Sequence, residues 1–204
     1  MRANRTELPA PAPHPEHPAG PRRFVGSIAA LCLVALAALP AAAATADHSP
    51  ALLSLLRAID QTPPAEAVRQ AAGKVQVEEA LFQVSVDADL PLYPRQRAIS
   101  LLSLFPGEAS RAYLQNTAAQ AQLQELRWAA IYTYVRSVGS YDAPAALAFC
   151  SAWLQSPRPL DREAVIRAIR HLKGPEADGL VAHQAATETD ATVLAAIRRY
   201  WLRR

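Results

Sequence analysis

A stripe of aromatic and apolar side chains is the part of this sequence best suited to bind another molecule. Trp128, Tyr132 and Val135 are spaced i, i+4 and i+7, which places them on one face of a helix. The aligned positions of two internal repeats are polar instead: Gln96, Ser100 and Ser103 in one, Glu163, Arg167 and Arg170 in the other. Polar equivalents predict that this face meets solvent, and exposed aromatics beside arginines dominate binding hot spots. We therefore predict a binding surface formed by Trp128, Tyr132, Val135, Arg167 and Arg170.

Two simpler interpretations of the same residues stay open. Large aromatic side chains at helical spacing commonly pack under a loop or against neighbouring helices, so Trp128 and Tyr132 would then belong to the core. Arginines on a helix face are commonly solvated charges, and Arg167 and Arg170 would then have no specific partner.

No other pattern points to catalysis or to a metal. The sequence has no Gly-x-Ser-x-Gly elbow, glycine-rich phosphate loop, His-Glu-x-x-His pair or paired cysteines. His171 and His183 have no second ligand at a metal-binding spacing, and His48 would chelate Cu(II) or Ni(II) only if the chain began at Ala46. We expect no catalytic residue, metal or cofactor, although residues brought together from separate helices would leave no motif in the sequence.

Three recurring arginines indicate how the stripe is positioned. Arg95, Arg127 and Arg162 lie 32 and 35 residues apart, and each precedes a small apolar residue by three positions and a glycine by twelve. A period of this size is typical of a helical solenoid, whose units bury their apolar faces by stacking. We predict an all-α fold, a right-handed α-solenoid of about three to four helical hairpins. The aligned apolar columns are Ala98, Ala130 and Val165; Ile99, Ile131 and Ile166; and Leu102, Tyr134 and Ile169.

The arginine segments resemble HEAT repeats of the short kind also found in phycobilin lyases. The pattern Arg-x-x-Ala-Ile-x-x-Leu is read from Arg127 to Gly139, and again from Arg95 and Arg162. The resemblance covers residues 94–204 and implies stacked hairpins in which the three arginines, here called the arginine ladder, make structural contacts with carboxylate or carbonyl partners. It says little about activity, because HEAT-like arrays serve mainly as scaffolds and binding surfaces.

Helical periodicity and capping signals give the expected elements. Before the repeats, residues 47–93 form an N-terminal helical region, with a helix starting at Ser49-Pro50 and a short helix over 65–72. Residues 73–89 are ambiguous between strand and helix, helix being favoured, and 90–94 are expected to be a loop. The repeats predict first helices over 108–121, 142–155 and 176–187, and second helices over 94–105, 125–138, 160–172 and 190–202.

The first 46 residues have the composition of a leader. Residues 1–21 are proline-rich and predicted to be disordered. Residues 22–46 have the layout of a signal peptide: two arginines, an apolar run over 24–39 and a small-residue site, with cleavage after Ala46, or after Ala44 as second choice. Cleavage predicts a periplasmic or secreted protein with Cys150 as its only cysteine. The alternative is an uncleaved inner-membrane anchor over 24–46.

Charge limits the classes of partner. From Asp47 onward the chain has 17 basic and 16 acidic residues, so a nucleic-acid partner is not expected. We predict an exported HEAT-like scaffold, not an enzyme, that binds a protein or peptide, with membrane contact only if 24–46 is uncleaved. Arg167 and Arg170 would suit an acidic partner. The alternatives are a lyase- or hydrolase-like enzyme using the solenoid groove, by analogy with phycobilin lyases, and a membrane-tethered structural module.

Overall fold

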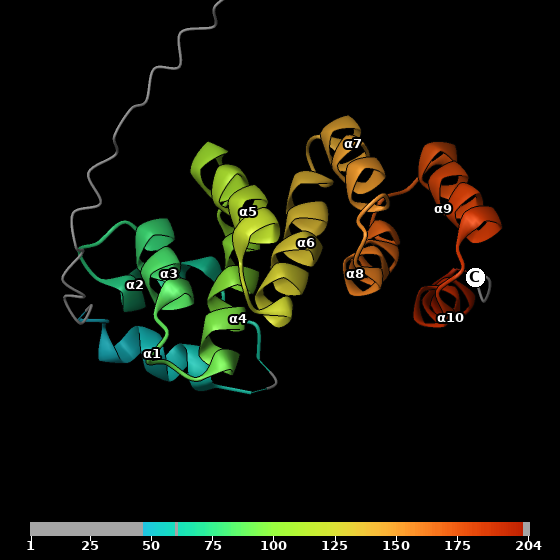
Figure 1. The fold of residues 1–204 in the computed structure, drawn as a ribbon. Helices are drawn as coiled ribbons and strands as arrows, with labels where there is room; N and C mark the ends of the chain where they lie inside the picture. Colours follow the sequence, from blue (N-terminus) through green and yellow to red (C-terminus); the bar gives the residue numbers. More distant parts are fainter. Residues whose placement is uncertain (1–46, 60, 202–204) are drawn as a thin grey trace, which may run out of the picture. The chain divides into compact units, whose positions relative to one another are not determined.

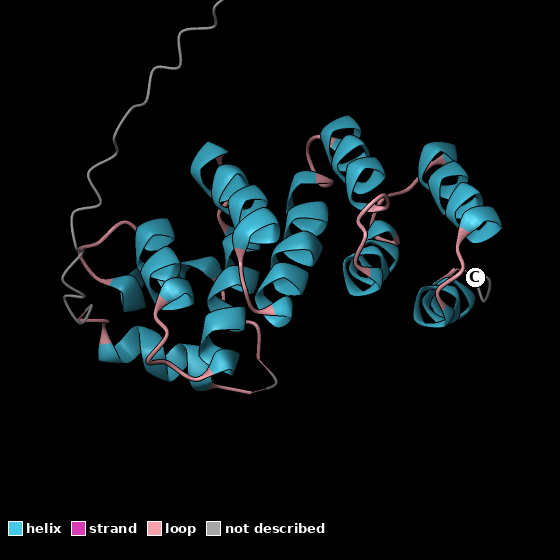
Figure 2. Ribbon diagram, viewed as in Figure 1, coloured by secondary structure: helices cyan, strands magenta, loops and turns pink. Residues whose placement is uncertain are grey.

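The structure is a computed structural model that describes residues 47–59 and 61–201. Within these residues every regular element is helical: ten α-helices and one 3₁₀ segment, with no strand (Figures 1 and 2). The predicted all-α class is therefore confirmed. The predicted disordered segment 1–21 and the signal peptide or anchor over 22–46 lie outside the described residues.

The N-terminal region is helical, as the sequence predicts. It contains α1 (Pro50–Arg57), α2 (Ala65–Ala72) and α3 (Val77–Val86). Ser49 caps α1, because its hydroxyl accepts the backbone N–H of Leu52 at 3.4 Å while Pro50 occupies the first turn. The ambiguous stretch 73–89 holds α3, so the preference for helix over strand is confirmed.

The predicted loop over 90–94 is wrong in part. Helix α4 (Leu92–Leu101) begins inside it and continues as η1 (Leu102–Leu104). Pro91 is the N-cap residue and Pro94 lies in the first turn, where a missing backbone N–H removes no helical hydrogen bond. The two prolines thus mark a helix start and not a connection.

The seven helices expected from the repeats are present, with ends within three residues of the predicted ones, except that α4 ends at Leu101, four residues before the predicted end, and continues as η1. Asp142 caps α7 through the backbone N–H of Ala145, and Asp190 caps α10 through those of Thr192 and Val193. The elements after α4 are α5 (Glu108–Gln120), α6 (Gln124–Val138), α7 (Ala143–Trp153), α8 (Pro159–Ile169), α9 (Pro175–Thr187) and α10 (Ala191–Tyr200).

The even-numbered helices form a consecutive series. Helix α4 contacts α6, α6 contacts α8, and α8 contacts α10, while α5, α7 and α9 pack against members of this series (Figure 1). Helix α4 also contacts α1 and α3, so the region before residue 94 packs directly on the repeats. The predicted apolar columns lie between these helices, and none of their nine residues is more than 1 % exposed. Burial of these columns supplies the main driving force for the packing.

Two glycines of the repeat occupy positions that suit no other residue, Gly139 because of its neighbours and Gly174 because of its backbone conformation. A Cβ on Gly139 would lie 2.2 Å from Cδ2 of Leu172 and 2.5 Å from the carbonyl oxygen of Val135, so α6 ends in close contact with the residues that follow α8. Gly174 has a φ of 124° at the start of α9, a conformation that L-residues rarely adopt.

Of the helices in the described ranges, none combines the length and the hydrophobicity needed to cross a bilayer. The segment 24–46, predicted as a signal peptide or an anchor, is not among them.

Candidate binding surface

Arg127 connects α6 to α8 through a buried carboxylate. Its Nε lies 3.4 Å from Oδ1 of Asp161, and its Nη1 donates to the carbonyl of Ala121 at 2.8 Å. Asp161 is only 1 % exposed and also accepts hydrogen bonds from Gln124 Nε2 (2.9 Å) and Ser156 Oγ (3.0 Å). Several donors around one buried carboxylate offset its loss of hydration. This contact is structural and leaves no surface for a ligand.

Arg162 makes the same type of contact one helix pair later. Its Nε and Nη2 each donate at 2.8 Å to one of the two carboxylate oxygens of Glu188, which follows α9. This bidentate contact lowers the pKa of Glu188 to about 2, against the opposing effect of burial. Nη1 of Arg162 donates to the carbonyl of Ser156, six residues earlier, as Arg127 does to Ala121. Each of these arginines thus holds both the turn before its own helix and an acid from a later segment.

Arg95 departs from this arrangement. Its Nε donates at 3.0 Å to the carbonyl of Ser85, at the end of α3, and no carboxylate of the described residues forms an ion pair with it. The residue that corresponds to Asp161 is Leu126, because each precedes a ladder arginine. The three arginines therefore share a contact with a backbone carbonyl, and only two of them hold a carboxylate.

The predicted stripe brings two aromatic rings of α6 against arginines of α8. The rings of Trp128 and Tyr132 are nearly parallel, with centroids 5.3 Å apart and an interplanar angle of 5°. The guanidinium carbon of Arg167 lies 5.9 Å from the Trp128 centroid, and Nη2 of Arg170 donates to the Tyr132 hydroxyl at 3.4 Å. Both rings are half-buried, so they are neither fully exposed to solvent nor part of the core. Four of the five predicted residues thus lie together.

Tyr200 of α10 extends this group across a third helix. The guanidinium carbons of Arg167, Arg170 and Arg199 lie 5.3, 5.4 and 5.3 Å from its ring centroid. We call Trp128, Tyr132, Arg167, Arg170 and Tyr200 the aromatic–arginine cluster. Each cation is attracted by the ring face, but three like charges around one ring also repel each other. Glu163 pairs with Arg167, its Oε1 accepting from Nε at 3.0 Å, and offsets one of the three charges.

The prediction that Val135 meets solvent is wrong. Val135 is fully buried, together with its neighbours Thr133, Tyr134, Ser137 and Val138. Helix α6 is contacted by α4, η1, α5, α7 and α8, so its C-terminal half is enclosed although its Trp128 and Tyr132 face is not. Val135 is a core residue and lines no surface.

Three residues at this surface, His171, Glu163 and Tyr200, were not predicted to belong to it. Tyr132 shares a 2.7 Å hydrogen bond between its hydroxyl and Nε2 of His171, and the two rings meet edge to face. The i, i+4 spacing of Glu163 and Arg167 is a readable signal for their ion pair. Tyr200 carries no such signal, because the last unit aligns with the others only through two buried apolar positions.

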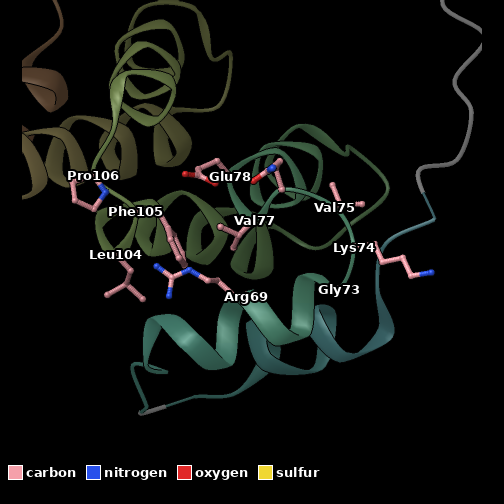
Figure 3. Close-up of a pocket in the computed structure, with 10 residues that line it drawn as sticks. Arg69, Gly73, Lys74, Val75, Val77, Glu78, Leu104, Phe105 and Pro106 are labelled. Carbon is pink, nitrogen blue, oxygen red and sulfur yellow. The ribbon is translucent and has the colours of Figure 1, made fainter.

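A separate pocket lies between the α2–α3 connection and the residues after η1 (Figure 3). It has a volume of about 490 Å³ and is lined by Arg69, Lys74, Glu78 and Phe105, among others. The guanidinium of Arg69 lies over the Phe105 ring at 5.3 Å and bonds Glu66, so this charge already has partners. Segments distant in sequence form the pocket, and no repeat signal predicts it.

His48 and Cys150 are engaged in structural contacts. Nε2 of His48 lies 2.8 Å from Oδ2 of Asp87, a hydrogen bond that lowers the pKa of the Asp87 carboxyl. Cys150 is fully buried, and desolvation raises the pKa of its thiol to about 12, so it packs as a small apolar side chain. Within residues 47–59 and 61–201, no group of three or more histidine, cysteine or acidic side chains is placed to hold a metal ion.

Comparison of the chain with protein-family models, with curated proteins and with solved structures finds no match. A proposal about function therefore depends on the geometry of the described residues.

Proposed function

We propose that this protein is an exported scaffold of HEAT-like helical hairpins, stacked as a right-handed α-solenoid, that binds an acidic protein or peptide segment through its aromatic–arginine cluster. The observation that carries the proposal is the convergence of the two stacked rings of this cluster, its two guanidinium groups and that of the neighbouring Arg199, which come from α6, from the C-terminal end of α8 and from α10.

The solenoid part of the proposal is supported by two features. The even-numbered helices contact one another in chain order, and residues at equivalent repeat positions are buried between them. Arg127 and Arg162 add equivalent contacts at successive positions along this series. Stacked hairpins with equivalent interfaces are the defining property of a solenoid.

The chemistry of the cluster indicates what the bound segment would contain. An acidic side chain placed near Tyr200 would relieve the mutual repulsion of the surrounding arginines and receive directed hydrogen bonds from them. An apolar or aromatic side chain would pack on the Trp128–Tyr132 face, where half-buried rings lose little conformational entropy on binding. Glu163 would disfavour a second acidic group close to Arg167, which limits how such a segment is oriented.

Replacing Trp128 and Tyr132 together by alanine tests this function. We expect the double variant to lose capture of acidic partners from an envelope extract, because truncating an aromatic hot-spot residue costs at least about 2 kcal/mol, or roughly thirtyfold in Kd. The measurement is a pull-down with the immobilised full chain, followed by identification of the captured proteins by mass spectrometry.

Tyr141→Ala serves as the matched control, since Tyr141 is a 53 % exposed aromatic outside the cluster. Circular dichroism must show the same helical signal in all variants. Arg170→Glu combined with Arg199→Glu should also remove capture, whereas Arg136→Glu, on an exposed position of α6, should not. Equal capture by the aromatic double variant and the Tyr141 control would rule out the cluster as the binding site.

A further inference from the structure

The first position of the arginine ladder lacks the acid that completes the other two. Arg127 and Arg162 both direct Nε towards a carboxylate, at 3.4 and 2.8 Å. Arg95 directs Nε to the carbonyl of Ser85 instead, and among the described residues no acceptor bonds its two Nη atoms. The position of the missing acid is occupied by Leu126, an apolar residue that is 5 % exposed. A guanidinium that can form two parallel hydrogen bonds to a carboxylate is therefore left without one.

Arg95 and Leu126 line a common pocket of about 370 Å³. Arg95 is the only charged residue among those that line it, and Asn116, Thr117 and Gln120 add polar groups. The carboxylate of Asp87 is bonded to His48 at 2.8 Å; it forms no ion pair with Arg95 and is attracted by it only at longer range, an effect that helps to lower the pKa of Asp87. A positive charge without an ion-pair partner attracts an anion more strongly in a concave site than on an open surface.

The apolar part of the same pocket suggests what accompanies the anion. Val86 and Leu123 line it and are 59 % and 42 % exposed, so they present accessible apolar surface beside Arg95. The ring of Tyr113 completes this part and is fixed by stacking on Phe82, with centroids 4.0 Å apart, and by a hydrogen bond to Ser85. A ligand with a short aliphatic portion would cover these groups while its carboxylate meets Arg95.

We infer that this pocket binds a carboxylate attached to a short aliphatic chain. Because Nε of Arg95 donates to Ser85, the carboxylate would lie on the Nη atoms and supply the acid that Asp161 and Glu188 provide, through Nε, to the other two ladder arginines. The ligand is either a free small acid or the C-terminal residue of a peptide, since both present this chemistry. The site is separate from the aromatic–arginine cluster and does not depend on the function proposed for it.

Titration of the full chain with defined probes tests the inference. The probes are 4-methylpentanoate, its neutral amide, and a tetrapeptide ending in leucine with either a free or an amidated C-terminus, with binding followed by calorimetry and by amide NMR shifts. We expect each carboxylate that binds to do so at least tenfold more tightly than its amide, because the charged hydrogen bonds to Arg95 are lost in the amide. Binding of 4-methylpentanoate alone identifies a free acid as the ligand, and tighter binding of the free-acid peptide identifies a chain terminus.

Two variants locate the site. Arg95→Gln should abolish binding, while Arg136→Gln, an exposed arginine elsewhere, should leave it unchanged. Leu126→Asp should also abolish binding, because an internal carboxylate would then occupy Arg95 as Asp161 occupies Arg127. If Leu126→Asp fails to fold in a thermal melt, Arg95→Gln alone decides the location. Absence of binding by every carboxylate, equal binding of acids and amides, or unchanged binding by Arg95→Gln would overturn the inference.

Discussion

Asp161 and Arg162 are adjacent in sequence but serve two different ion pairs. Asp161 accepts from Arg127 of the preceding even-numbered helix, while Arg162 donates to Glu188 ahead of the following one. Each pair is largely removed from solvent, with side-chain exposures of 8 % and 1 % for Arg127 and Asp161 and of 14 % and 2 % for Arg162 and Glu188. Removing one member of such a pair leaves the other charge without a partner, which is costly in a buried setting.

The Arg162–Glu188 pair predicts a pH dependence of stability. The pKa of Glu188 is about 2 in the folded protein, against 4.5 for the unperturbed group, so folding favours the ionised form. The stabilisation is therefore fully present above pH 4.5 and is lost as the pH falls towards 2. We expect Glu188→Gln to lower the free energy of unfolding by on the order of 2 kcal/mol at about pH 7, and the difference from the native chain to shrink below pH 4.5.

Urea unfolding of both proteins between about pH 7 and about pH 2 measures this difference. Glu125→Gln, at an exposed position of α6, is the control and should show no comparable change. A gap between the native chain and Glu188→Gln that stays constant over the whole range would contradict the depressed pKa.

The sequence predicts the burial of some residues but not the contacts that others make. The repeat alignment identifies the buried columns and the ladder arginines, because apolar periodicity follows directly from helix geometry. It does not identify Asp161 as the partner of Arg127 or Tyr200 as the neighbour of Arg167, since these contacts depend on how separate helices are placed. Val135 fails for a related reason: its polar equivalents predict exposure, but α6 has more neighbours than the other helices of its series.

At the scale of elements, the repeat glycines differ although their spacing makes them look equivalent. Gly139 ends α6 where a side chain would meet Leu172 and the Val135 carbonyl, whereas a Cβ on Gly107, before α5, would meet no atom within 4 Å. Gly107 has a φ of −168°, an extended conformation open to any residue. Of these two glycines, only Gly139 is thus required by close packing between elements.

This contrast predicts opposite effects of the same substitution. Gly139→Ala should lower the free energy of unfolding by about 2 kcal/mol, because the added methyl forces the end of α6 away from Leu172. Gly107→Ala should be neutral or stabilising by about 0.5 kcal/mol, through reduced freedom of the unfolded chain. Denaturant unfolding of both variants checks the prediction, and equal stability of the two would show that α6 and the residues after α8 are not tightly packed.

A helix start is predicted more reliably from a capping side chain than a loop is predicted from proline. Ser49, Asp142 and Asp190 each begin a helix by accepting backbone N–H groups, and such residues can be recognised in a sequence. Pro91 and Pro94 predict a loop because proline disrupts helices, yet the same residue is favourable in a first turn. The residues after the prolines decide between these two interpretations, and here they form an apolar periodic stretch that continues as a helix.

For the whole molecule, the predicted leader determines where the chain should begin when its own host produces it. We expect N-terminal sequencing of the protein from its own cells to begin at Asp47, after cleavage behind Ala46, or at Thr45 if the second-choice site is used. Fractionation should place this species in the periplasm or the medium. An intact Arg22-Arg23 leader on a membrane-associated protein would instead support the anchored alternative.

Asp161 pairs with Arg127, which precedes it in the chain, and Arg162 pairs with Glu188, which follows it. This arrangement has an evolutionary consequence. A tandem duplication of residues 128–162 would bring both residues along, so the new Asp161 would face the old Arg162 and the new Arg162 would face Glu188. A chain lengthened in this way would gain one complete ion pair and no unmatched buried charge. Duplication of the stretch that ends at Leu126-Arg127 would instead add an arginine without its acid, so only the first duplication would keep each added arginine paired.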